Sequence, residues 1–174
     1  MFKQDNESNV TRFLFAILLI IVSVAQFTWL SAAGFLGISP NLVLVFVLIL
    51  AGRYGAREGV VWAFAAGILL DLLALDPLGS NALALIPVAL IGSVARRSML
   101  HSGLLMIMLM VIAGTVTHFV VASIIDTLMG SGYSLSVSIR LGLVTAFLNA
   151  LTVPPLYGLV MLLDRVGVQR VAQA

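Results

Sequence analysis

The placement of charged residues is the strongest constraint on how this chain folds. Nine basic and seven acidic side chains are spread over 174 residues, and they divide the chain into six long apolar stretches. A helix needs about 20 residues to cross the hydrocarbon core of a bilayer, which is about 30 Å thick. The spacing of the charges therefore predicts an all-α, polytopic membrane bundle of six transmembrane helices.

Composition agrees with a membrane protein and excludes several other classes. Hydrophobic residues make up 61% of the chain and charged residues 9%, too few to cover the surface of a soluble globule. The chain contains no cysteine and two histidines, so neither a thiolate site nor a histidine metal cage is expected. We expect no cofactor and no bound metal, and the few basic residues do not indicate nucleic acid.

The gaps between charges also predict where the spans begin and end. The membrane domain is expected at residues 13–164, with short tails at 1–12 and 165–174. Six spans are expected at 13–30, 39–53, 58–75, 80–97, 104–129 and 138–163. Ser39 is the expected N-cap of the second span, and Pro40 its first helical residue. Pro154 and Pro155 predict a kink or local unwinding near Ala150 in the last span.

The basic residues predict the orientation of the chain in the membrane. Eight of the nine fall in the two tails, the second loop and the fourth loop, and the opposite loops contain only Arg140. Because loops rich in Lys and Arg stay in the cytoplasm, both termini are expected to be cytoplasmic. An even number of spans satisfies this arrangement, with membrane lipids around the bundle.

Four polar side chains are expected deep within the spans. They are Gln26, Asp71, His118 and Asn149. At 1.5 Å per residue, each lies roughly 20 to 22 Å from the end of its span that is predicted to be cytoplasmic. An ionisable side chain inside lipid costs about 2.5 to 3.5 kcal/mol, so we expect a polar layer in which Asp71 accepts hydrogen bonds from some of the others. Such a layer holds the bundle in register, docks a partner helix, or binds a proton or ligand.

Small residues on the third span predict a face for close helix packing. Gly59, Ala63 and Gly67 recur every four residues on the same side as Asp71. Asp71 is the only acidic residue placed deep in the membrane, so the pair of carboxylates that aspartyl chemistry needs is missing. We therefore do not expect an enzyme.

Several motifs resemble those of the family of rod shape-determining protein MreD. They are Pro40-Asn41-Leu42-Val43-Leu44, then Gly67 to Leu73 followed by Pro77-Leu78-Gly79 and Asn81-Ala82-Leu83, and Asn149 followed five residues later by Pro154. Gln26, near the end of the first span, also fits. The resemblance covers nearly the full length of the chain.

The resemblance implies a non-enzymatic subunit of the bacterial elongation (rod) complex in the inner membrane. Its implied partners are the bitopic protein MreC, the actin-like MreB, and the cell-wall polymerase and transpeptidase. The resemblance also implies a fold similar to the substrate-binding subunits of energy-coupling-factor transporters. An alternative is therefore a small-molecule-binding subunit of a vitamin-type transporter, although the outer loops offer few charged or aromatic side chains for a ligand.

Overall fold

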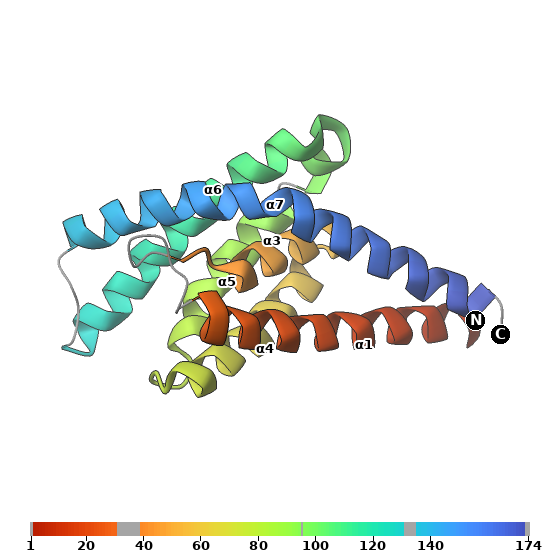
Figure 1. The fold of residues 1–174 in the computed structure, drawn as a ribbon, viewed down its shortest axis with the longest axis horizontal. Helices are drawn as coiled ribbons and strands as arrows, with labels where there is room; N and C mark the ends of the chain where they lie inside the picture. Colours follow the sequence, from red (N-terminus) through yellow and green to blue (C-terminus); the bar gives the residue numbers. More distant parts are fainter. Residues whose placement is uncertain (1, 31–38, 95, 131–134, 173–174) are drawn as a thin grey trace.

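The computed structural model describes residues 2–30, 39–94, 96–130 and 135–172, and the described chain is helical almost throughout. Figure 1 shows how the helices pack together. In chain order they are α1 (Phe2–Ala25), which continues into the π-helical segment η1 (Gln26–Leu30), α3 (Leu42–Tyr54), α4 (Ala56–Ala74), α5 (Ser80–Val94), α6 (Arg96–Leu128) and α7 (Leu135–Ala172). The predictions of an all-α fold and of six helices are confirmed.

Three helical segments are long and apolar enough to cross a membrane. They are Val10–Thr28, Gly103–Leu128 and Ile139–Arg165. By contrast, α3 has 13 residues, which makes it about 20 Å long. α5 has 15 residues and is also short. That α3, α4 and α5 cross the membrane stays a prediction.

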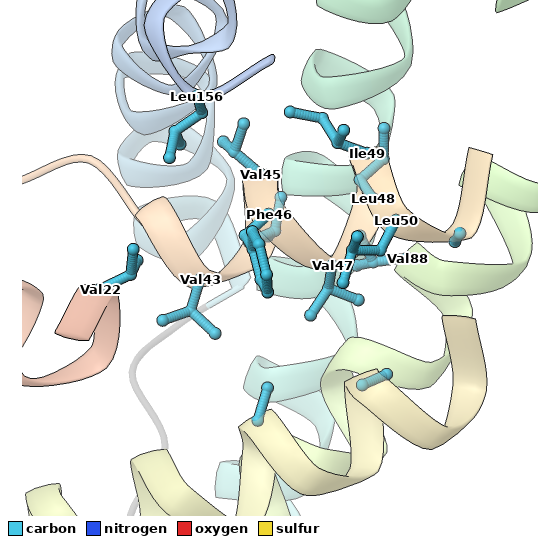
Figure 2. Close-up of a cluster of buried hydrophobic side chains, with 14 of the residues drawn as sticks. Val22, Val43, Val45, Phe46, Val47, Leu48, Ile49, Leu50, Val88 and Leu156 are labelled. Atoms are coloured by element: carbon cyan, nitrogen blue, oxygen red, sulfur yellow. The ribbon is translucent and has the colours of Figure 1, made fainter. Parts of the chain in front are cut away.

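The shortest of the described α-helices, α3, lies at the centre of the bundle. Every residue from 43 to 52 is buried, and α1, α4, α5, α6 and α7 all contact this helix. Side chains project from several sides of α3 toward residues of its neighbours, including Val22, Val88 and Leu156 (Figure 2). A helix that is hydrophobic all round is expected in a core, and the sequence of α3 has no polar face until Arg53.

Glycines allow three helices to approach α3 closely. A Cβ atom at Gly59 of α4 would lie 2.5 Å from the Cβ of Ala51, and one at Gly92 of α5 would lie 2.7 Å from the carbonyl oxygen of Leu48. At Gly114 of α6 it would lie 2.9 Å from the Leu48 Cδ1 atom. Larger side chains at Gly59 and Gly92 would meet backbone atoms and force α4 and α5 away from α3, whereas at Gly114 the end of the Leu48 side chain would have to move.

The stripe predicted on α4 lies between α3 and α5. Gly59, Ala63 and Gly67 are all buried. A Cβ atom at Gly67 would overlap the backbone of Ala82 in α5. The stripe therefore faces the two short helices, where no larger residue has room.

The two longest helices each change direction. In α6 the backbone of Gly103 has φ 70° and ψ −164°, which interrupts the helix just before the predicted start of the fifth span at residue 104. Figure 1 shows this sharp turn near the beginning of α6. α7 stays helical through Pro154 and Pro155 and bends part-way along its length in Figure 1. Of the two predicted outcomes near Ala150, local unwinding is not found, and the bend of α7 agrees with the alternative, a kink.

The predicted tails continue the long helices. Residues 2–12 extend α1 and residues 165–172 extend α7, and the outer ends of the two helices lie close together in Figure 1. Their placement in the cytoplasm stays a prediction. The first loop from 31 to 38 lies outside the described residues.

Candidate functional site

The N-terminus of α3 is capped by three amide side chains from separate parts of the chain. The first N–H groups of a helix have no partner within it, and inside a protein they need other acceptors. Gln26 Oε1 accepts a hydrogen bond from the Val43 N–H at 3.1 Å, and Asn149 Oδ1 accepts one from the Asn41 N–H at 2.6 Å. Asn41 Oδ1 accepts from the Leu44 N–H at 2.9 Å. We call Gln26, Asn41 and Asn149 the amide cap.

The amide cap corrects the predicted start of the second span. Asn41 is the N-cap of α3, and the helix begins at Leu42. Ser39 and Pro40 therefore precede the helix, and the prediction that they cap and open it is wrong. Asn41 is the better cap because its side-chain oxygen reaches the N–H three residues later.

Asn149 links the amide cap to a third helix. Its side chain is fully buried, and its Nδ2 group donates a hydrogen bond to Thr115 Oγ1 of α6 at 2.9 Å. The Thr115 hydroxyl in turn donates to the Val111 carbonyl oxygen at 2.8 Å. Both ends of the Asn149 amide are therefore bonded, which ties α7 to α3 and to α6.

A pocket of about 270 Å³ lies beside the amide cap. Its described lining is Gln26, Ser39, Pro40, Asn41, His118, Phe119, Leu141 and Thr145. His118 is 8% exposed, and neither of its ring nitrogens has a hydrogen-bond partner among the described residues. Its ring meets that of Phe119 edge-on, with centroids 6.0 Å apart. The pocket thus combines hydrogen-bonding groups with an apolar wall.

Asp71 forms a separate cap at the beginning of α5. Its carboxylate is 1% exposed and accepts hydrogen bonds from the Gly79 N–H at 2.6 Å and the Asn81 N–H at 3.0 Å. The Ser80 hydroxyl donates at 3.1 Å and the Asn81 side-chain amide at 2.8 Å. A carboxylate at a helix N-terminus is favoured by the helix dipole and by these charge-assisted bonds.

The hydrogen bonds predicted between Asp71 and the other polar residues are therefore wrong. None of its described donors is Gln26, His118 or Asn149. The tight turn between α4 and α5 brings N–H groups only eight to ten residues away within reach of the carboxylate. Closing such a short loop costs less conformational entropy than ordering distant donors around the same group.

The two caps nevertheless lie at the same end of the bundle. A second pocket, of about 190 Å³, is lined by Gln26 and Asn41 from one cap and by Asn81, beside Asp71, from the other. The structure thus brings Gln26, Asn41 and His118 to one pocket and joins Asn149 to it through Asn41. Asp71 stands next to this group and is not bonded to it.

The opposite end of α3 carries ionic contacts that sequence reasoning missed. Arg53 Nε donates to Asp164 Oδ2 at 3.0 Å, and the Tyr54 hydroxyl donates to Asp164 Oδ1 at 2.7 Å. Arg12 of α1 pairs with Glu58 of α4. The sequence did contain a signal for these ion pairs. The charged residues stand at the ends of apolar stretches, where side chains of opposite charge can meet.

The arrangement holds helices together and offers hydrogen bonds, and it gathers few groups suited to catalysis. Among the described residues, no three His, Cys, Asp or Glu side chains come together as a metal site requires. The buried carboxylate of Asp71 already accepts four hydrogen bonds. A carboxylate engaged in this way serves as a structural cap.

Comparison with known families identifies the chain. The model of the family described as rod shape-determining protein MreD matches residues 7–165. The chain belongs to the MreD family. The resemblance seen in the sequence is confirmed, and the protein is a rod shape-determining membrane protein. No curated protein and no solved structure matches it, so the expected likeness to energy-coupling-factor subunits stays a prediction.

The residues that carried the resemblance to MreD lie mostly at the capped end. Asn41 caps α3, and Pro40 lines the larger pocket. Gly79 donates its N–H to Asp71 and has φ 95°, a conformation that favours glycine. Leu78 is exposed in the same turn, and Pro154 lies within α7. The motif of this MreD-family chain is thus largely a set of turn and capping residues.

Proposed function

We propose that this MreD-family protein is a non-enzymatic, multi-pass subunit of the bacterial inner membrane that binds an MreC-like bitopic partner. Through that partner it helps to organise MreB and the cell-wall polymerase and transpeptidase during lateral growth. Family membership over residues 7–165 is the observation that carries this proposal. The family is one of shape-determining proteins, which supports a scaffolding role over a catalytic one.

The surface of the long helices supports a role in binding other membrane helices. In the three membrane-length segments a third or less of the most apolar window is buried inside the protein. Ile20 of α1, Leu109 of α6 and Leu151 of α7 are each more than half exposed. Lipid covers such faces, and a partner helix can replace lipid where the two surfaces fit closely.

The charge pattern supports an orientation with both termini in the cytoplasm. Arg53 pairs with Asp164 in the C-terminal half of α7, and Arg12 pairs with Glu58, which follows shortly after Arg53 in the chain. Both arginines therefore lie toward the same end of the bundle. In this orientation the amide cap and the larger pocket face the outer side of the membrane. Because the chain has no cysteine, single cysteines can report the sidedness of each loop.

Site-specific photocrosslinking tests the proposed partner. The crosslinker benzoylphenylalanine is placed at Ile20, Leu109 or Leu151 in cells that also express MreC. We expect crosslinks to MreC, identified by its mass and by antibody, from at least one of these helix faces. The matched control is the same three variants kept without irradiation, in which no covalent crosslink can form. Failure to capture MreC from any of the three faces would contradict the proposal.

A further inference from the structure

The larger pocket is lined by polar groups that carry no formal charge. Its described lining includes the amides of Gln26 and Asn41, the hydroxyls of Ser39 and Thr145, and the imidazole of His118. No Asp, Glu, Lys or Arg belongs to that lining. An ion entering the pocket would lose part of its water and gain no opposite charge, which is unfavourable. The pocket therefore favours an uncharged occupant.

The adjacent helix N-terminus does not change this conclusion. Helix N-termini commonly bind anions through their free N–H groups. At α3 the N–H groups of Asn41, Val43 and Leu44 already donate to amide oxygens of the protein. A phosphate or carboxylate would have to displace these oxygens, which disfavours an anion in the pocket.

His118 indicates what kind of group the pocket holds. Its side chain is more than nine-tenths buried and lines the pocket, and both ring nitrogens lack a described hydrogen-bond partner. A neutral imidazole has one N–H donor and one nitrogen acceptor. Leaving both unsatisfied in a buried site is unfavourable. A bound group that both donates and accepts would satisfy the ring.

We propose that this pocket binds a small uncharged molecule carrying an amide or hydroxyl group, with His118 as the recognition residue. The volume of about 270 Å³ lies just below the usual range for drug-sized ligands. Phe119 and Leu141 supply an apolar wall for the rest of the molecule. This site is independent of the scaffolding role proposed above.

Nitrogen NMR of the histidine ring tests the proposal directly. The protein has two histidines, so a His101→Gln variant labelled with ¹⁵N-histidine reports on His118 alone. Three probes of similar shape are compared in detergent micelles: benzamide, which is neutral and both donates and accepts, benzoate, which is charged, and toluene, which is apolar. We expect benzamide to shift the ring-nitrogen resonances saturably, and benzoate and toluene to leave them unchanged.

A stability measurement gives a second, independent readout. We expect benzamide to raise the thermal unfolding midpoint of the wild-type protein, and to leave that of a His118→Phe variant unchanged. If the variant does not fold, the NMR titration still decides. Equal shifts with toluene and benzamide would show an apolar cavity and overturn the proposal, as would the absence of any saturable shift with benzamide.

Discussion

Asn149 and Asn41, 108 positions apart in the chain, are joined by a hydrogen bond of 2.6 Å from the Asn41 backbone N–H to the Asn149 Oδ1 atom. This bond fixes the N-terminus of the central helix α3 against the long helix α7. The other end of the Asn149 amide reaches Thr115 of α6. A single buried side chain therefore sets the relative positions of three helices.

Replacing Asn149 with Leu is expected to destabilise the protein. The change leaves the Asn41 N–H without its acceptor, at a cost of about 1–3 kcal/mol for the buried group. The measurement is the free energy of unfolding in detergent. Thr117→Val serves as the control, because the Thr117 hydroxyl only donates to the Ala113 carbonyl of its own helix. Equal stability of the two variants would contradict the role of the amide cap.

Replacing Asp71 with Asn should destabilise the turn between α4 and α5. Each carboxylate oxygen of Asp71 accepts at least one hydrogen bond, whereas Asn has one acceptor and would turn its amide donors toward the Gly79 or Asn81 N–H. We expect a loss of about 1–3 kcal/mol in the free energy of unfolding. Asp76→Asn is the matched control, since Asp76 is exposed in the same turn and its carboxylate accepts a single described hydrogen bond, from the Asn81 side-chain amide at 3.2 Å.

The result for Asp71 separates a role in capping α5 from a role in binding MreC. If Asp71→Asn lowers stability and leaves MreC binding by the folded fraction intact, the residue acts as a helix cap. If the variant is as stable as Asp76→Asn and as the wild type, the capping role is wrong.

Gly67→Ala is expected to push α4 away from α5. Its new Cβ atom would overlap the Ala82 backbone, and overpacking of this kind typically costs about 1–3 kcal/mol. Gly158→Ala in α7 is the control, because nothing lies within 4 Å of a Cβ atom built there. The control should be neutral or stabilising by up to about 1 kcal/mol, from the higher helix propensity of Ala. Thermal unfolding in detergent distinguishes the two variants.

The ion pair of Arg53 and Asp164 should be stronger than that of Arg12 and Glu58. The side chains of the first pair are 31% and 20% exposed, against 55% and 29% for the second, and Asp164 also accepts from Tyr54. Double-mutant cycles to Ala measure each coupling energy. We expect about 0.2–1 kcal/mol for the more exposed pair and a larger value for the other. The reverse order would contradict a structural link between α3 and α7.

The helices could be predicted from the sequence because charges are excluded from lipid. Arg53 and Glu58 lie within a few residues of the end of α3 and the start of α4, whereas Arg12 lies inside α1, which begins already at Phe2. The uniform hydrophobicity of α3 also indicated that this helix is buried on every side. A short membrane span was the simpler interpretation of the same pattern. The central position of α3 depends on packing with all its neighbours.

The hydrogen-bond partners could not be predicted in the same way. Counting residues gives the height of Gln26, Asp71 or Asn149 along a helix, and it does not give the direction in which the side chain points. Gln26 and Asn149 both reached the α3 N-terminus, whereas Asp71 turned to the nearby N–H groups of Gly79 and Asn81. An acidic residue shortly before a Gly-Ser-Asn turn was a signal for such a cap.

The amount of MreC that co-purifies with this protein from inner membranes tests the central claim most directly. Tagged protein is isolated in mild detergent from cells that express MreC, with an unrelated multi-pass membrane protein as the control. We expect MreC to be retained with the MreD-family protein and to be absent from the control. If MreC is present in the membranes and equally absent from both preparations, the proposed role as an MreC-binding subunit is contradicted.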